Sequence, residues 1–261
     1  AVESYDKVIR FSNSLPQAYS RRGDALHKLH QLNAAIASYD KAILAAPGHF
    51  EAYFNRANVL KELGKIDEAI RAYDDAIYIQ PDFHQAHYNR ANTLKAQGDL
   101  QAALDGYSQA IAIKSDFTEA HFNRGVVLQD MQSLEQALQS YERALQLDPD
   151  NSDVHNNIGT VLLAQKKHDA ALAKFLKAIE LKASNVEAHS NLGSVFKELG
   201  QYEEAFASYE KASALSQDYS SLMLMHTRTW LCDWDHFEVK VSQLAKDVEI
   251  HARSAQPFHY H

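Results

Sequence analysis

The stretch EAYFNRANVLKELG, residues Glu51–Gly64, decides the fold, because it returns as EAHFNRGVVLQDMQ at Glu119–Gln132, two steps of 34 residues later. A period of about 20 to 50 residues is typical of stacked repeats and takes precedence over local propensity. Small residues recur at this period in two columns: Ala35, Ala69, Ala103, Ala137, Ala171 and Ala205, and Ala42, Ala76, Ala110, Ala144, Ala178 and Ala212. The middle of the chain is therefore predicted to repeat one structural unit.

An aromatic column runs between the two alanine columns, at Tyr39, Tyr73, Tyr107, Tyr141, Phe175 and Tyr209. The spacing puts all three columns on one face of a helix, which we expect to be the core. A further column of small residues, Gly23, Ala57, Ala91, Gly125, Gly159 and Gly193, lies in the preceding helical segment. Minimal side chains there let two helices approach closely, so each unit is predicted to be a helical hairpin.

Glycine and proline fall where such hairpins must turn. Gly64, Gly98 and Gly200 follow the first helical segments, where glycine is a favourable C-terminal cap. Pro47, Pro81 and Pro149 follow the second segments and prevent their continuation. The turn signals therefore share the 34-residue period.

These columns resemble the tetratricopeptide repeat. The resemblance implies an all-α fold, a right-handed superhelical α-solenoid whose inner groove is lined mainly by first helices, with a C-terminal helical cap. The expected units are 16–49, 50–83, 84–117, 118–151, 152–185 and 186–219, preceded at 1–15 by the second helix of a truncated unit. Because the chain opens inside a repeat and without Met, we expect a fragment of a longer protein.

Composition narrows the range of functions. The chain is 46% apolar, which suits a folded core, and its formal charge of -8 disfavours nucleic acid as a partner. The acidic balance also disfavours helical repeats that read RNA bases. One cysteine, Cys232, cannot form an intramolecular disulfide, and no segment resembles a membrane span or signal peptide. We therefore expect a cytoplasmic protein without membrane partners.

One asparagine recurs two residues before each small residue of the first helices, and these asparagines are here called the asparagine column: Asn55, Asn89, Asn123, Asn157 and Asn191, with Arg21 in the equivalent place of the first unit. Two residues correspond to about 200° around a helix, away from the hairpin partner and toward the groove. An asparagine amide complements the C=O and N–H of a peptide unit. The column therefore predicts binding of a protein or extended peptide through its main chain.

Other interpretations of the same residues stay open. The asparagines could instead bond only to an adjacent helix or to water. Asn58 and Asn92, one residue beyond the small column, are weaker candidates for peptide contact, with Asp24 as their counterpart. The residues just before the column, Phe54, Tyr88, Phe122, Asn156 and Ser190, lack the cations of a carboxylate clamp.

Two further columns could suggest other chemistry. His87, His121, His155 and His189 recur at the same period. Successive repeats lie about 10 Å apart, whereas zinc ligands lie near 2 Å from the ion, so packing is favoured over metal binding. Arg22, Arg56, Arg90 and Arg124 form an arginine column that gives way to Ile158 and Leu192. Packed stems with solvated heads are the simpler interpretation, and a basic stripe for an acidic partner is the alternative.

No catalytic, cofactor or metal site is predicted. All nine glycines lie within the repeats, so none remains for a phosphate-binding loop, and no nucleophile, base and orienting group form a recognisable set. The chain by itself is therefore expected not to be an enzyme.

Residues 220–261 are predicted to form capping helices, with Trp230 and Trp234 buried in the cap. Within them, LCDWDHF, carried by Cys232, Asp233 and Trp234, and the later Pro257 and Phe258 resemble the junction between repeats and catalytic region in O-linked N-acetylglucosamine transferases and SPINDLY-type relatives. In that family the repeats recruit protein substrates along an asparagine ladder, and a following domain uses UDP-GlcNAc. The resemblance maps the asparagine column onto that ladder and implies a substrate-recruiting region whose catalytic region is absent here.

Two function classes remain: this recruiting region, or a free-standing tetratricopeptide scaffold that assembles other proteins. The repeats alone do not separate them. The sequence also leaves open a homodimer formed through the outer face.

Overall fold

The computed structural model describes residues 2–11 and 15–216, and all regular secondary structure within these ranges is helical. The helices are α1 Val2–Phe11, α2 Pro16–Lys28, α3 Leu32–Ala45, α4 Phe50–Glu62, α5 Ile66–Ile79, α6 His84–Ala96, α7 Leu100–Ile113, α8 Thr118–Asp130, α9 Leu134–Leu147, α10 Ser152–Ala164, α11 His168–Leu181, α12 Val186–Glu198 and α13 Tyr202–Leu215. The predicted all-α repeat fold is confirmed. The predicted capping helices at 220–261 lie outside the described residues.

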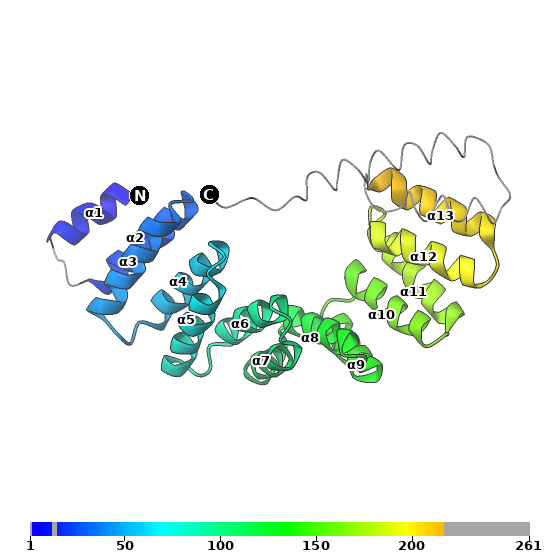
Figure 1. Cartoon of the computed structure of the whole chain (residues 1–261), viewed down its shortest axis with the longest axis horizontal. Helices are drawn as coiled ribbons and strands as arrows, with labels where there is room; N and C mark the ends of the chain where they lie inside the picture. The colour runs from blue at the N-terminus through cyan, green and yellow to red at the C-terminus, as the bar shows by residue number, and fades with distance from the viewer. Residues whose placement is uncertain (1, 12–14, 217–261) are drawn as a thin grey trace, which may run out of the picture. The chain divides into compact units, whose positions relative to one another are not determined.

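Consecutive helices pair into hairpins. We call α2, α4, α6, α8, α10 and α12 the first helices and their partners α3, α5, α7, α9, α11 and α13 the second helices. The chain divides into two compact units, 1–147 and 148–261. Within unit 1, α1 packs on α2, and α3, α5 and α7 each pack on the next first helix (Figure 1). Within unit 2, α11 packs on α12 in the same way.

The core consists of the columns that the period predicts. All six members of the aromatic column are at most 1% exposed. Their rings press against the small residues of the first helices: a Cβ added to Gly23, Gly125, Gly159 or Gly193 would lie 2.5 to 2.8 Å from a ring atom. Ala57 and Ala91 occupy the equivalent place in the two remaining hairpins and are fully buried. The small column thus allows the close approach of the paired helices.

The turn between the two helices of a hairpin has a left-handed residue at one fixed place. Gly64, Gly98 and Gly200 have φ of 75°, 85° and 76° there, which confirms the predicted caps. In the other three hairpins, His30, Gln132 and Lys166 adopt φ of 54°, 59° and 60° at the equivalent position. Packing of the paired helices therefore imposes this backbone geometry even where the residue is not glycine.

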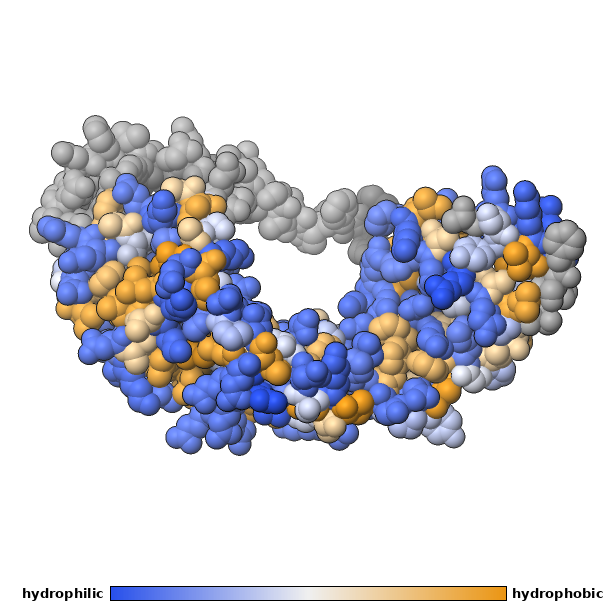
Figure 2. Space-filling view, turned by 180° about the vertical axis from the view of Figure 1, so that it is seen from behind, coloured by the Kyte–Doolittle hydropathy of each residue, from blue (hydrophilic) through white to orange (hydrophobic). Residues whose placement is uncertain are grey.

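In Figure 2 hydrophilic residues predominate on the visible face of unit 1, with apolar residues in smaller groups between them. Among the described helices, none combines the length and the apolar character that crossing a bilayer requires.

Candidate peptide-binding face

The asparagine column lies along the first helices. Asn55, Asn89 and Asn123 stand on α4, α6 and α8 of unit 1, and Asn157 and Asn191 stand on α10 and α12 of unit 2. All five side chains are half-buried. Each is thus held by neighbouring residues while part of it still meets solvent.

In unit 1 each asparagine of the column donates a hydrogen bond from Nδ2 to the same position of the preceding first helix. The acceptor is always the Oδ1 atom of the residue just beyond the small column. The three pairs are Asn55 with Asp24 at 3.1 Å, Asn89 with Asn58 at 3.0 Å, and Asn123 with Asn92 at 3.2 Å. One amide hydrogen is therefore used between repeats, as the adjacent-helix interpretation expects.

Each of these acceptors also accepts a hydrogen bond from a tyrosine hydroxyl of its own hairpin. Tyr39 donates to Asp24 at 2.9 Å, and the equivalent bonds to Asn58 and Asn92 are both 2.6 Å long. Burial, followed by the Asp24 charge, raises the pKa of Tyr39 well above its usual value, so this hydroxyl stays a donor. Asn58 and Asn92 thus link the buried aromatic column to the asparagine column.

Two column amides of unit 1, Asn55 and Asn89, keep both a donor and an acceptor after this contact. An asparagine offers two N–H hydrogens and one acceptor oxygen. Asn55 and Asn89 each use one hydrogen between repeats, whereas Asn123 uses both, on Asn92 and on the Tyr88 hydroxyl. In Asn55 and Asn89 the Oδ1 atom has no hydrogen-bond partner among the described residues. One donor and one acceptor therefore remain at these two positions, which is the pair that a peptide unit requires, and Asn123 keeps its acceptor oxygen.

In unit 2 the column borders a pocket. Asn191 donates to Oδ1 of Asn156 at 2.9 Å, and Asn156 donates to Oδ1 of Asn157 at 3.3 Å. The pocket of about 360 Å³ is lined by Asn156, Val186, Glu187, Ser190, Asn191 and Ser216. The sequence argument did not select Asn156 or Ser190 as contact residues, although both lie one residue before a column asparagine.

Aromatic rings flank the column in unit 1. Phe54 packs edge-to-face on Phe83 with centroids 4.9 Å apart, and Tyr88 packs on Phe117 at 4.8 Å. The Tyr88 hydroxyl also accepts a 2.8 Å bond from Nδ2 of Asn123. These half-buried rings give unit 1 an apolar border beside its amides, where unit 2 has Asn156 and Ser190. Their place immediately before the column was the signal that could have identified them.

At the other end of unit 1, Arg21 occupies the column position on α2. It is exposed and lines a pocket of about 570 Å³ between α1 and α2 together with Val2, Glu3, Tyr5, Asp24, Ala25, Lys28 and Leu29. The pocket contains two cations and two carboxylates, so it has no net charge. Asp24 lines this pocket and also accepts the Nδ2 hydrogen bond of Asn55.

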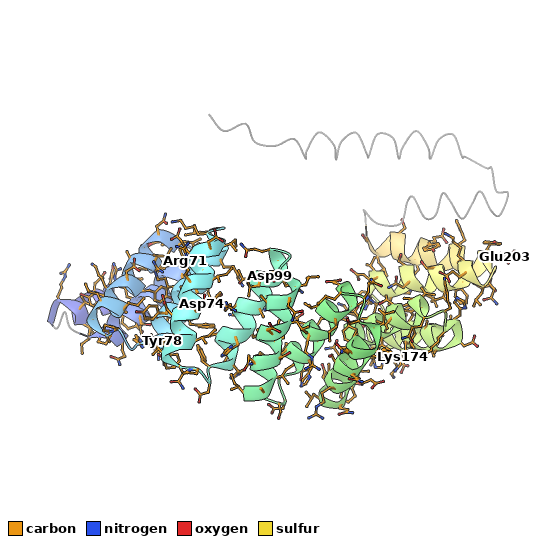
Figure 3. All side chains as sticks on the ribbon, turned by 60° about the horizontal axis from the view of Figure 1, so that its bottom comes forward. Arg71, Asp74, Tyr78, Asp99, Lys174 and Glu203 are labelled. Carbon is orange, nitrogen blue, oxygen red and sulfur yellow. The ribbon has the colours of Figure 1, made fainter. Side chains whose placement is uncertain are left out.

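The arginine column pairs with carboxylates rather than forming a free basic stripe. Each arginine reaches an aspartate 16 residues earlier, on the helix before its own. The pairs are Arg22 with Asp6 at 2.6 Å, Arg56 with Asp40 at 2.7 Å, and Arg90 with Asp74, labelled in Figure 3, at 2.5 Å. These three ion pairs link successive helices of unit 1.

Arg124 is the exception, because Ser108 stands where the other members have aspartate. Its Nε donates instead to Oγ of Ser140 at 3.1 Å, and burial lowers the pKa of its guanidinium. We expect Ser108→Asp to raise the free energy of unfolding by about 0.5 kcal/mol, because the new carboxylate would form the ion pair that Arg124 lacks. Urea denaturation followed by circular dichroism measures this, with uncharged Ser108→Asn as the matched control. The gain should shrink in 1 M salt, and equal stability of the two variants would contradict it.

The histidine column serves the loops between hairpins. Each Nε2 atom lies 2.9 to 3.1 Å from the backbone carbonyl six residues earlier, at Pro81, Ser115, Pro149 and Ala183. A carbonyl only accepts, so Nε2 carries the hydrogen and Nδ1 is left without one in the neutral ring. In His121 and His155 the Nδ1 atom is buried without a partner. Each of the four rings therefore fixes the loop before its helix through one hydrogen bond to a backbone carbonyl of that loop.

Acidification should destabilise the fold around the buried rings of His121 and His155. Burial lowers the pKa of His121 and His155 below the usual value. Near pH 6.5 the unfolded chain therefore binds protons at these histidines more readily than the folded chain does. Stability from these groups is complete above that pH and is lost as the pH falls through it. Between pH 7.5 and 5.5 we expect a loss on the order of 1 kcal/mol relative to a His121→Gln, His155→Gln variant, measured by urea denaturation. Parallel pH profiles of the two proteins would refute this.

Family profiles match the same residues that form the hairpins. The profile described as TPR repeat matches 57–98, 91–132, 130–166 and 159–200. Profiles described as tetratricopeptide repeat match 38–71, 16–49 and 186–219. No curated protein matches the sequence. The resemblance to O-linked N-acetylglucosamine transferases thus stays a prediction, and its residues Cys232–Trp234 lie outside the described part of the chain.

Solved structures share the fold at low sequence identity. A tetratricopeptide repeat protein from Parabacteroides merdae has a TM-score of 0.72 at 16% identity, covering 94% of this chain and 93% of that one. PilF of Pseudomonas aeruginosa has a TM-score of 0.66 at 23% identity, covering 76% and 90%. YrrB, described as a TPR protein with an unusual peptide-binding site, has a TM-score of 0.62 at 22% identity, covering 73% and 97%.

Proposed function

This chain belongs to the tetratricopeptide repeat family, whose repeats form a protein-interaction module, and we propose that its asparagine column binds extended polypeptide through the ligand's main chain. The observation that carries the proposal is the recurrence of one half-buried amide along the first helices. In Asn55 and Asn89 it keeps an acceptor and a donor after its contact with the preceding helix.

The spacing of the column suits an extended chain. Packed helices lie about 10 Å apart, while an extended chain advances about 3.3 Å per residue. Every third peptide unit of the ligand would therefore meet an asparagine. Such contacts use groups that every non-proline residue carries, so affinity would depend little on the ligand's side chains. Ligand residues between the asparagines would meet the rings of Phe54, Tyr88 and Phe122 in unit 1.

The experiment removes the amides together. Replacing all five column asparagines by alanine should weaken binding of 15-residue peptides, selected from a random displayed library, by at least about 100-fold, because several hydrogen bonds of about 1 kcal/mol each are lost. Fluorescence polarisation measures the affinity. The control replaces Asn33, Gln109 and Gln139, three exposed amides on second helices, by alanine and should bind normally. Unchanged peptide affinity of the fivefold variant, with an intact helical spectrum, would end the proposal.

We further propose that this module recruits protein substrates for an O-linked N-acetylglucosamine transferase-like enzyme in the cytoplasm. The support is the likeness of Cys232, Asp233 and Trp234 to the junction in that family, together with the asparagine column before it. A free-standing scaffold is the alternative. Several hundred further residues of alternating strand and helix pattern encoded after His261 would favour the enzyme, whereas a stop codon there would favour the scaffold.

A further inference from the structure

We propose that the asparagine column of unit 1 accepts an extended polypeptide in one direction only, with the ligand's amino end over α8 and its carboxyl end over α2. This inference rests on the proposed function, since it concerns how the same amides would hold a ligand. It adds a direction for the ligand chain, which neither the repeat period nor the identity of the asparagines specifies.

The orientation of the first amide follows from its partner. Nδ2 of Asn55 donates to Oδ1 of Asp24, and a carboxylate only accepts hydrogen bonds. The nitrogen of this amide is therefore turned toward α2, the preceding first helix, and its oxygen is turned away from α2. No exchange of the amide nitrogen and oxygen of Asn55 would preserve the contact.

The next two amides have the same orientation. Asn89 donates to Asn58 on α4, and Asn123 donates to Asn92 on α6. Asn123 also donates its second hydrogen to the Tyr88 hydroxyl on α6, so it offers a ligand only its acceptor oxygen. All three nitrogens thus face the amino-terminal neighbour, and all three oxygens face the carboxyl-terminal side of the unit.

The ligand's own geometry then sets its direction. In an extended strand the N–H and C=O of one residue point to the same side, and the N–H lies nearer the chain's amino end. At Asn55 and Asn89 a two-point contact pairs the ligand N–H with Oδ1 of the asparagine and the ligand C=O with Nδ2, whereas at Asn123 the ligand N–H meets Oδ1 alone. Because Nδ2 faces the preceding repeat, the ligand must run from α8 toward α2, opposite to the order of the repeats.

The opposite direction fails at every position. A reversed strand would set its N–H against Nδ2 and its C=O against Oδ1, so donors would meet donors and acceptors would meet acceptors. Each such mismatch leaves polar groups without partners. It affects both groups of the amide at Asn55 and Asn89, and at Asn123 it sets a ligand C=O against Oδ1. The preference therefore accumulates along Asn55, Asn89 and Asn123.

A tethered peptide tests the direction without needing a known ligand. In the full chain, Cys232→Ser removes the natural thiol, and Arg21→Cys provides one on α2 at the column position. The probes are two peptides of twelve alternating threonine and alanine residues with blocked ends. One carries a cysteine at its carboxyl end and the other at its amino end, and each is joined by a disulfide. Twelve extended residues span about 40 Å, enough to pass the three repeat steps from α2 to α8.

The readout is the nuclear magnetic resonance shift of the side-chain amides of Asn55, Asn89 and Asn123. The peptide tethered by its carboxyl end should shift all three, with the change at Asn123 at least about tenfold larger than for the other peptide. The same tether in a variant with these three asparagines replaced by alanine should leave the backbone amides of α6 and α8 unshifted.

The outcomes separate the two proposals. Shifts at Asn123 that are as large with the amino-end tether would overturn the direction while leaving main-chain binding in place. An absence of shifts at Asn89 and Asn123 with either tether would overturn the proposed function itself, and the direction with it.

Discussion

Replacing Tyr107 by alanine is expected to lower the free energy of unfolding of unit 1 by about 4 kcal/mol. The ring is fully buried and packs with Ala91, Leu94, Ala103 and Val127 across its own hairpin and the next one. Removing it leaves a cavity at a point where two hairpins meet. It also takes away the 2.6 Å hydrogen bond that the hydroxyl donates to Asn92.

Tyr78→Ala is the matched control for this prediction. Tyr78 lies on α5 of the same unit, its side chain is 88% exposed, and Figure 3 shows it at the surface. Its replacement should change the stability by less than about 0.5 kcal/mol. Urea denaturation followed by circular dichroism compares the two variants. If they unfolded at the same urea concentration, the aromatic column would not be the core of the hairpins.

Gly125→Leu is expected to destabilise unit 1 by about 3 kcal/mol, because the core has no room for a larger side chain at this position. A Cβ added here would lie 2.5 Å from Cε1 of Tyr141, so α8 and α9 would have to separate. Gly125→Ala should cost much less. Alanine already fills the equivalent place at Ala57 and Ala91, where it lies against the same kind of ring.

Gly48→Leu separates a packing effect from the general cost of removing a glycine. Gly48 lies in the turn between α3 and α4, and a Cβ added there meets nothing within 4 Å. Its replacement should leave the urea midpoint nearly unchanged. A loss for Gly48→Leu equal to that for Gly125→Leu would mean that the close contact of α8 with Tyr141 is not what restricts position 125.

Much of the fold could be predicted from the sequence because its determinants are local and repeated. The aromatic position follows the first alanine by four residues and precedes the second by three. These offsets define the buried face of the second helices, and the rings of Tyr39 to Tyr209 are buried there. The turn glycines at 64, 98 and 200 have the positive φ that their role as caps requires. The left-handed residues Gln132 and Lys166 could not be recognised, because the residue type gave no sign of a conformation that packing imposes.

The candidate site was predictable in position but not in its bonding. Lying two residues before the small column was enough to place Asn55 and Asn89 outside the buried core of their hairpins, where both side chains are half-buried. That Asn58 accepts from both Tyr73 and Asn89 could not be read from the sequence, since the three residues belong to three different helices. The pairing of Arg56 with Asp40 depends on neighbouring helices in the same way.

The sequence by itself determined that this chain is a stack of helical hairpins, which of their faces are buried, and where one asparagine recurs. A period of 34 residues and the 3.6-residue turn of the helix are sufficient for those conclusions. Only the tertiary structure decided which way each amide points. The direction of an amide depends on how far one first helix is shifted and rotated against the next. The packing of side chains between neighbouring hairpins sets this shift and rotation, so the sequence of a single repeat does not specify it.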